Sequence, residues 1–345
     1  MLTVYTVEQS AQWDTVVRSF AAYDVYWLNG YVKAFQLHGD GEPLLFYYED
    51  EAVRGINVVM KRDIAKNPHF TDKLPENTYF DFATPYGYGG WLIEGEQLDG
   101  LFNAYEAWCR ENGIISEFVR FHPISRNHVF CQSVYEIVDL GNTVALDISS
   151  PDILWSNITS KNRNMIRKAR KNGIQIYNGR YPEIYRQFKS IYDETMIEDH
   201  AEKYYFFSSR FYDSILCDLQ QNAQVFYAVF EGKTIAASIF LYANGKMSYH
   251  LSGSAKEYAH LGPNNLLLYE AALWGSACGG KTLYLGGGVG SREDNLFKFK
   301  KSFYRGDDLN RFYIGKKVFL PEQYAALCEK REHLPQSSFF PAYRG

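Results

Sequence analysis

The chain has 345 residues and a slightly acidic balance, with 36 Lys and Arg against 40 Asp and Glu and a net charge of -4 at pH 7. This length predicts two domains, each of which can bury its own core. The charge argues against binding to duplex DNA, which needs a broad basic face. No basic leader precedes an apolar core and no run reaches about 18 apolar residues, so we expect a cytoplasmic protein that neither spans a membrane nor is secreted.

Metal and disulfide chemistry are not indicated. The five cysteines are odd in number and scattered, and they lack a C-x-x-C spacing, which argues against a disulfide framework and a zinc site. The eight histidines are dispersed without an H-x-x-x-H pair. We therefore expect no metal, and the absence of G-x-S-x-G argues against a serine nucleophile on an elbow.

The first part of the chain alternates helical and extended patterns. In chain order, these patterns predict helices over 7–20 and 29–39, a hairpin over 43–60, a loop over 80–91, a helix over 98–112 and a strand over 113–121. The loop contains the sequence TPYGYGG, whose proline and glycines break regular structure. The predicted order is helix, helix, strands, helix, strand.

The same order then begins again. The patterns of this second part predict a basic helix over 161–171, a strand over 173–177, helices over 182–196 and 208–219, and a three-stranded meander over 224–254. A helix over 263–280, a strand over 281–288, a short helix over 295–303 and a strand over 311–315 are predicted to follow. The two halves share this order of elements without a repeat at the level of residues.

The basic helix places six Lys and Arg within a dozen positions. Thr159 or Ser160 can cap its start, and Gly173 stands where a left-handed residue ends a helix. The period of 3.6 puts Ile166 and Ala169 toward a core. The opposite face carries the basic residues Arg163, Arg167, Arg170 and Lys171. Such a face is either solvated or an anion site, and cations in the first helical turn oppose the helix dipole unless an anion neutralises them.

Two further motifs have the chemistry of an anion site. Gly262 and Pro263 begin a helix directly after a strand and loop, which leaves the main-chain amides of Asn264 and Asn265 free to donate to an anion. The run Gly286–Gly288 follows a strand and precedes Lys300, which could present an ammonium to the same cleft. The alternative for this second motif is a flexible loop with an exposed lysine. Neither motif is a Walker or G-x-G-x-x-G sequence.

Taken together, these motifs resemble those of the Fem-type peptidyltransferases and related GNAT-like acyltransferases, called FemAB-like or BioF2-like. The matching positions are Lys161, Arg163, Ile166, Arg167, Lys168, Ala169, Lys171 and Gly173, then His250, Leu251, Gly253 and Ser254, then Gly262 and Pro263, Gly286–Gly288, and Phe299, Lys300 and Phe303. They span residues 159–304 in the family's order. The loop Thr84–Gly90 is similar to the aromatic and glycine-rich loop of the family's first domain.

The resemblance implies an α/β fold with two tandem GNAT-like domains, each a mixed, mostly antiparallel sheet flanked by helices. The implied domains are 1–145, joined by a C-terminal helix over 321–345, and 146–320. The implied activity is transfer of an acyl or aminoacyl group to an amine of a phosphorylated or nucleotide-linked precursor of peptidoglycan or another envelope polysaccharide. The donor would be acyl-CoA, such as acetyl-CoA, or aminoacyl-tRNA. Contact with tRNA and a peripheral position at the inner membrane remain open.

The resemblance also assigns roles to residues. The implied phosphate and substrate contacts are Lys161, Arg163, Arg167, Gly262, Asn264, Asn265, Phe299, Tyr86 and Tyr88. Lys300 would stabilise the developing oxyanion. The attacking amine must lose a proton, and the candidate acceptors are His250, Tyr249, Glu270 and His200, each of which has packing or ion pairing as its alternative.

Two departures from the family leave the donor undecided. The loop SAKEYAHLGPNN lacks the R/Q-x-x-G-x-G/A pattern that binds the pyrophosphate of CoA, and the chain has no room for the helical hairpin that some Fem enzymes use with tRNA. A degenerate GNAT pair that binds an anionic glycan or nucleotide-sugar is therefore an alternative to the enzyme. For the enzyme, Lys300→Ala and Arg163→Ala are expected to abolish transfer and to leave stability intact, as changes at the surface of a cleft.

Overall fold

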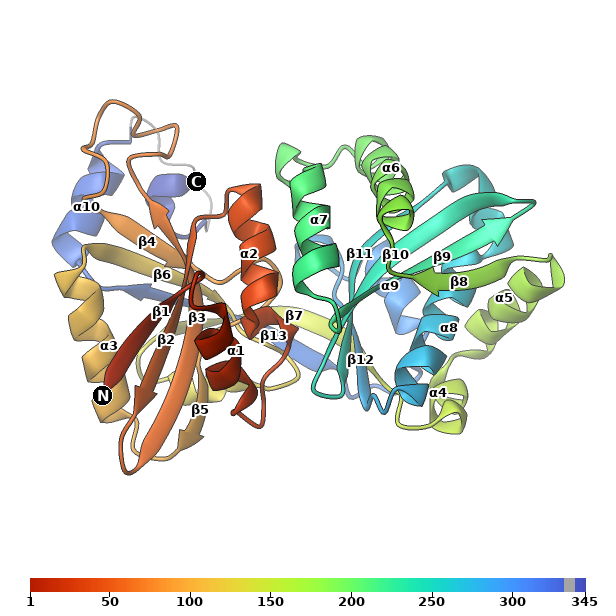
Figure 1. Ribbon diagram of the computed structural model, residues 1–345, viewed down its shortest axis with the longest axis horizontal. Coiled ribbons are helices and arrows are strands. Elements are labelled where there is room, and N and C mark those ends of the chain that lie inside the picture. The colour runs from red at the N-terminus through yellow and green to blue at the C-terminus, as the bar shows by residue number, and fades with distance from the viewer. Residues whose placement is uncertain (332–338) are drawn as a thin grey trace. The chain divides into compact units, whose positions relative to one another are not determined.

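The computed structural model describes residues 1–331 and 339–345 (Figure 1). They form two compact units, of which the first comprises Met1–Leu140 with Phe312–Gly345 and the second Gly141–Arg311. The sequence analysis placed the boundary between the two domains at residues 145 and 146 and the end of the second domain at residue 320, and both limits differ from those of the two units. The final strand, β13 (Asn310–Val318), explains the second difference, because its residues Ile314–Val318 pair with β6 (Ile114–Arg120) of the first unit.

The sheet of the first unit has the strand order β1-β2-β3-β4-β6-β13. Its other strands are β1 (Leu2–Thr6), β2 (Glu42–Glu49), β3 (Val53–Asp63), β4 (Phe80–Ala83) and β5 (Leu92–Gly95), which pairs with β3. The helices are α1 (Ser10–Arg18), α2 (Asn29–His38), α3 (Asp99–Glu111) and α10 (Pro321–Glu329), with short 3-10 turns at Val25–Trp27, Asn127–Cys131 and Ala342–Arg344. The hairpin β2–β3 turns between Glu49 and Val53, as its sequence predicts.

The C-terminal residues are fastened to the first unit by a buried carboxylate. Asp81 accepts hydrogen bonds from Arg62 Nε at 2.7 Å, from Tyr343 Oη at 3.0 Å and from Arg344 Nε. The expectation of one helix over 321–345 is wrong, because α10 ends at Glu329 and residues 339–345 form a loop and a 3-10 turn. Residues 332–338 lie outside the described part of the chain.

A second buried carboxylate, Glu117, lies inside the first unit. It accepts hydrogen bonds from Asn57 Nδ2 at 2.9 Å, Tyr105 Oη at 3.0 Å and Tyr135 Oη at 2.6 Å. Burial raises the pKa of the Glu117 carboxyl above 4.5, although these three donors oppose that shift. The folded protein therefore keeps this proton at pH values where the unfolded chain has lost it.

We expect Glu117→Gln to remove a pH-dependent loss of stability. As pH rises from about 4.5, the unfolded chain binds fewer protons at this site than the folded chain, so this group lowers the free energy of unfolding. Urea unfolding from pH 4.5 to 7 should show that the difference between wild type and variant grows in favour of the variant. Glu111→Gln, at an exposed position on α3, is the control. A difference that does not change with pH would contradict this account.

The sheet of the second unit has the order β7-β12-β11-β10-β9-β8. Its strands are the part of β7 (Glu136–Asp147) from Gly141 onward, β8 (Gln175–Gly179), β9 (Ala223–Phe230), β10 (Lys233–Ala243), β11 (Lys246–Ser254) and β12 (Thr282–Gly286). The helices are α4 (Pro151–Asn157), α5 (Ser160–Lys171), α6 (Pro182–Glu198), α7 (Ser209–Asp218), α8 (Pro263–Ala277) and α9 (Asn295–Lys301). The meander over 224–254 is confirmed, whereas β7 and α4 were not predicted.

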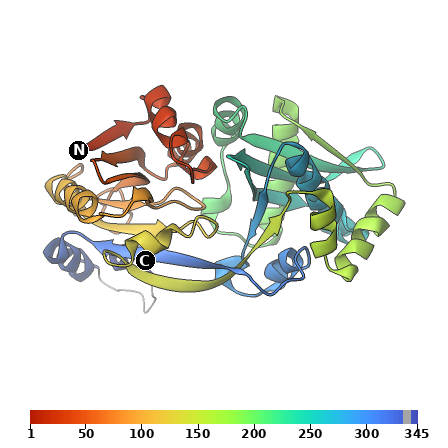
Figure 2. The same cartoon turned by 90° about the horizontal axis from the view of Figure 1, so that it is seen from below.

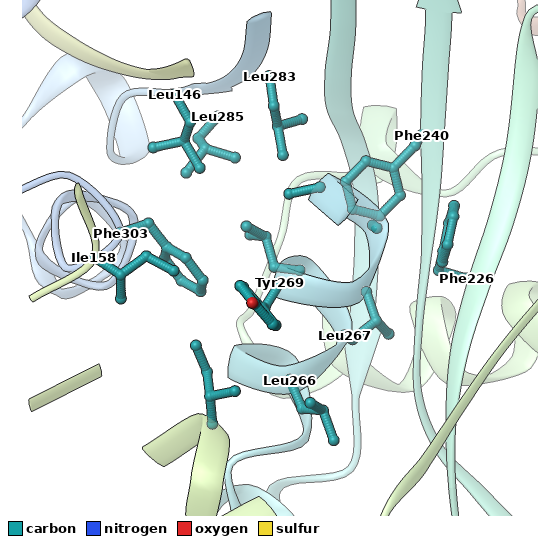
Figure 3. Close-up of a cluster of buried hydrophobic side chains, with 14 of the residues drawn as sticks. Leu146, Ile158, Phe226, Phe240, Leu266, Leu267, Tyr269, Leu283, Leu285 and Phe303 are labelled. Carbon is teal, nitrogen blue, oxygen red and sulfur yellow. The ribbon is translucent and has the colours of Figure 1, made fainter. Parts of the chain in front are cut away.

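Helices cover both faces of this second sheet. In both views α6 and α7 lie on one face, and α8 lies on the other with α4 and α5 (Figures 1 and 2). The core between the sheet and α8 joins side chains from distant segments (Figure 3). It includes Ile158, which precedes α5, and Phe303, which follows α9. One core therefore anchors both the basic helix and the lysine-bearing helix.

Candidate functional site

The sheet of the second unit opens between two neighbouring strands. β11 and β12 are parallel and pair only at Lys246↔Thr282, Met247↔Leu283 and Ser248↔Tyr284. Beyond these pairs β11 continues to Ser254, whereas Gly286 of β12 pairs with β7 on its other side. The main chain between Tyr249 and Ser254 is thus turned away from the ladder of β12.

A bulge marks the point of this separation. In the β10–β11 pair, Leu251 faces Ile239 and Tyr249 faces Phe240, so His250 is the extra residue. A bulge bends its strand and redirects side chains, and bulges are frequent beside active sites. His250 thus occupies the position where β11 leaves β12.

The start of the basic helix is joined to the end of α9. Thr159 caps α5, because its Oγ1 accepts from the main-chain N–H of Asn162, and the same hydroxyl donates to the carbonyl of Ser302 at 2.8 Å. The main-chain N–H of Thr159 also donates to this carbonyl, at 3.1 Å. Gly173 has φ +83°, as expected for the residue that ends the helix. The predicted cap, core face and end of α5 are all confirmed.

The start of α8 lies against the same helix. Gly262 has φ +76°, and a Cβ atom there would lie 3.0 Å from Cε of Met165 on α5. Pro263 is the first helical residue, as predicted. Asn265 Nδ2 donates to Asn162 Oδ1 at 2.8 Å, and Lys168 Nζ donates to the carbonyl of His260 at 3.0 Å. The amino ends of α5 and α8 are therefore neighbours.

Asn162 is a candidate site residue that the sequence analysis missed. Its side chain is 2% exposed, and its Nδ2 has no hydrogen-bond partner among the described residues. A buried amide without a partner is costly, and an anion at the helix starts would satisfy it. The signal was present in the spacing, because residues 162, 166 and 169 share one helical face and only the first is polar.

The arginines of α5 divide into two groups. Arg163 and Arg167 lie over the ring of Trp155, at 5.9 and 5.2 Å from its centroid. Arg170 instead pairs with Glu270 at 2.6 Å and lies over the ring of Tyr269. Glu270, a candidate base, is thus held in an ion pair between α5 and α8, whereas Lys161 is exposed at the start of α5.

Lys300 is more buried than expected for a residue at the surface of a cleft, and it is not the exposed lysine of the alternative interpretation. It is 8% exposed, and its Nζ donates to the carbonyl of Gly287 at 2.6 Å. Burial lowers the pKa of Lys300 to about 8, although nearby Asp294 opposes this shift. Asp294 caps α9, which begins at Asn295, and Lys300 lies on the buried face of this short helix, where its side chain reaches the glycine loop. Phe299 beside it packs at the edge of the core.

The remaining candidate bases have different surroundings. Burial lowers the pKa of His250 to about 3, so its imidazole is neutral at pH 7 and a weak proton acceptor. Burial raises the pKa of Tyr249, whose ring packs 5.4 Å from that of Phe240, so this hydroxyl stays protonated. His200 is exposed on the turn after α6, next to the ion pair of Asp199 with Lys256.

Tyr86 and Tyr88 belong to a loop of the first unit whose carbonyls are held by side chains. Five main-chain carbonyls in residues 86–91 accept hydrogen bonds from side chains. Tyr31 Oη donates to the carbonyl of Tyr86, and Arg120 Nε donates to that of Gly87. Asn127 Nδ2 donates to the carbonyls of Gly89 and Trp91, and Trp27 Nε1 donates to that of Gly90. The ring of Tyr86 stacks on Phe35 at 5.5 Å, and that of Tyr88 meets Tyr26 edge-on at 5.4 Å. The loop is thus fixed in one conformation, with both tyrosines half-buried.

The first unit also differs from the second in its parallel strand pair. β4 pairs with β6 along its whole length, from Phe80↔Ile114 to Ala83↔Phe118, and the loop continues the contact because Gly89 N donates to the carbonyl of Arg120 at 2.8 Å. The parallel strands β4 and β6 of the first unit therefore stay paired, unlike β11 and β12 of the second.

A buried Asp24–His122 pair packs against this loop, with the His122 ring 5.7 Å from that of Tyr88. His122 Nε2 is 3.1 Å from Asp24 Oδ2, and His122 Nδ1 accepts from the main-chain N–H of Ser125 at 3.2 Å. Both ring nitrogens face protein groups, which leaves the imidazole to hold the loop rather than to move a proton. No local pattern predicts this pair, because its members are far apart along the chain.

Residues 1–331 and 339–345 hold no group of three His, Cys, Asp or Glu that could bind a metal ion. None of the helices in this part of the chain combines the length and apolar character needed to cross a bilayer.

Comparisons with known proteins agree with the fold. Residues 160–300 match the family model described as an acetyltransferase (GNAT) domain. The structure of FemX is similar over 94% of this chain and 99% of its own, with 12% identity and a TM-score of 0.68. The structure of L-PGS from Bacillus licheniformis is similar over 94% of this chain and 97% of its own, with 13% identity and a TM-score of 0.57. The structure of a conserved protein of unknown function from Bacteroides thetaiotaomicron is similar over 92% of this chain and 100% of its own, with 11% identity and a TM-score of 0.59.

None of the curated proteins matches the chain by sequence. At these low identities the solved structures establish the fold alone. Residues 160–300 thus match the model of an acetyltransferase (GNAT) domain, and the α/β fold of the chain is similar to that of FemX, as its motifs predicted.

Proposed function

We propose that this protein transfers an acyl or aminoacyl group from a phosphate-containing donor to an amine. The observation that carries the proposal is the opening between β11 and β12, which lies in the same unit as the adjoining starts of α5 and α8. The place where β11 stops pairing with β12 is where an acyl carbonyl would meet the main chain of β11. The two helix starts, with Asn162 and the arginines of α5, suit the phosphates of the same donor.

The chemistry needs one new bond and one broken bond. The amine nitrogen attacks the donor carbonyl carbon, and the C–S bond of a thioester or the C–O bond of an aminoacyl ester breaks. The amine loses a proton, and the leaving sulfur or oxygen gains one. The Lys300 ammonium, whose pKa is about 8, is largely charged at pH 7 and can stabilise the oxyanion that forms in between.

We further propose that the acceptor is the amino group of a phosphorylated or nucleotide-linked envelope precursor and that the donor is aminoacyl-tRNA or acyl-CoA. The fold likeness to FemX and to a protein named lysylphosphatidylglycerol synthetase, with a TM-score of 0.56, supports aminoacyl transfer. The GNAT family match supports a CoA ester equally. Such substrates are made in the cytoplasm, where we place the protein.

A binding module without activity is the second candidate. The loop between β11 and α8 lacks the usual R/Q-x-x-G-x-G/A pattern, and residues 256–261 of that loop form a 3-10 turn. Without turnover, the same helix starts would still retain an anionic glycan or nucleotide-sugar.

Donor binding and transfer separate these candidates. The full chain is incubated with a UDP-linked muramyl peptide and with either labelled acetyl-CoA or charged tRNA, and the products are measured by mass spectrometry. A rise in melting temperature with one donor identifies it, because a ligand at 100 times its Kd stabilises the folded state by about 2.7 kcal/mol. Transfer supports the enzyme. Binding of the UDP-linked peptide without transfer from either donor supports the binding module.

We expect Arg163→Ala to reduce transfer at least tenfold and to change the melting temperature by only a few degrees. The arginine is half-buried beside Trp155 at the start of α5, where its main role would be to meet donor phosphate. Arg18→Ala is the matched control, because Arg18 is also a helical arginine near an aromatic ring, that of Tyr23 at 5.9 Å. Equal activity of the two variants would show that Arg163 binds no donor.

A further inference from the structure

Three tyrosines form an exposed cluster at the edge of the second unit's sheet. Tyr177 of β8 faces Tyr227 of β9 in the strand register, and their rings stack with centroids 5.7 Å apart and planes 28° apart. The hydroxyls of Tyr181 and Tyr227 are 3.0 Å apart. Tyr177 and Tyr181 are 45% and 43% exposed. We call these three residues the tyrosine platform.

The platform is held in place by its neighbours. Tyr177 Oη donates to Gln175 Oε1 at 2.7 Å, which fixes the ring along the strand. A Cβ atom on Gly179 would lie 2.5 Å from the ring of Tyr181, so the missing side chain lets this ring lie against the end of β8. Pro182 then begins α6 and restricts the chain after Tyr181. The exposed rings are therefore ordered before any ligand arrives.

The charged residues that flank the platform along the chain already have partners. Between residues 175 and 186 the charged residues are Arg180, Glu183 and Arg186. Arg180 donates to the carbonyl of Leu216, and Arg186 pairs with Glu183 at 2.6 Å. Nucleic acids and anionic lipids need cations that remain available for phosphate, so these surroundings favour a neutral ligand.

From this arrangement we infer that the tyrosine platform binds a neutral saccharide chain. Sugar rings present apolar C–H faces that stack on tyrosine rings, while their hydroxyls bond to tyrosine hydroxyls and amides. Burial raises the pKa of Tyr227 to about 12, which keeps its hydroxyl protonated. The side chains of Gln224 and Asn178, joined at 2.7 Å across the same two strands, add amide groups at the sheet edge. The inference does not rest on the proposed transfer reaction.

The test measures binding of neutral oligosaccharides to the full chain. Saturation-transfer NMR and calorimetry are run with chitotetraose and with cellotetraose. We expect binding of at least one of them, weakened on the order of tenfold by Tyr177→Ala and by Tyr181→Ala. Tyr177→Phe keeps the stacked ring and should stay within about threefold of wild type. Phe130→Ala removes an exposed aromatic ring from the first unit and is the control for non-specific stacking.

Two results would overturn the inference. One is that neither sugar binds at millimolar concentration. The other is that a sugar binds equally well to the wild type and to the two alanine variants. Two further measurements test for other occupants of the platform. Self-association of the wild type that Tyr177→Ala abolishes, measured by light scattering, would assign the platform to a second copy of the chain. Binding of a single-stranded RNA oligonucleotide that depends on Tyr177 would assign it to nucleic acid.

Discussion

Replacing Lys300 by Met is expected to lower transfer by about 10²–10³-fold while the free energy of unfolding at pH 7 stays the same or rises. The ammonium is buried, and burial lowers its pKa from 10.5 to about 8, so its charge costs folding energy at neutral pH. Methionine fills a similar volume without that charge. The loss of one hydrogen bond to Gly287 works in the opposite direction and offsets part of the gain.

The pH dependence of stability provides a second readout for Lys300. Between pH 8 and 10.5 the unfolded chain holds this proton and the folded chain releases it, so the wild type gains stability as pH rises. The Met variant should lack that gain in urea unfolding. Lys298→Met, at an exposed position on the same helix, is the control for activity and for pH. A Lys300→Met protein that keeps full activity would remove Lys300 from the proposed mechanism.

Asn127→Ala is expected to destabilise the first unit by about 3–5 kcal/mol. The side chain is 1% exposed and makes three hydrogen bonds to main chain, donating to the carbonyls of Gly89 and Trp91 and accepting from the N–H of His122. Alanine leaves all three groups buried without these partners. Urea unfolding of the full chain measures the loss.

Asn112→Ala is the matched control for this change. Asn112 also donates to a main-chain carbonyl, that of Trp108 at 2.8 Å, but it is exposed, so water replaces the lost bond. We expect a loss of less than about 1 kcal/mol there. If the two variants lost stability equally, the bonds of Asn127 would not be what holds the loop.

Local signals in the sequence predicted the helices of the site well. Thr159, Gly173 and Pro263 act through their own backbone or cap bonds, so their neighbours along the chain were sufficient to place the ends of α5 and the start of α8. The buried face of α5 followed from the spacing of Ile166 and Ala169.

Features that depend on distant segments could not be predicted in the same way. The limited pairing of β11 with β12 is set by strands that are about 30 residues apart, and no local pattern reports its extent. The burial of Lys300 depends on how the glycine loop covers α9. Two of the three partners of Asn127, Gly89 and Trp91, lie on a loop that is 38 and 36 residues earlier in the chain, and the residue itself looks like any polar residue of a turn.

The path of the chain through its two units has a consequence for biosynthesis. The second unit is continuous from Gly141 to Arg311, whereas the first needs strand β13 and the anchoring of Tyr343 and Arg344 to Asp81. A ribosome therefore synthesises all residues of the second unit before it makes Phe312–Gly345, which complete the first. Residues 1–140 must wait in an unfinished state until residues 312–345 have left the ribosome, and it is during this interval that a nascent-chain chaperone would be needed.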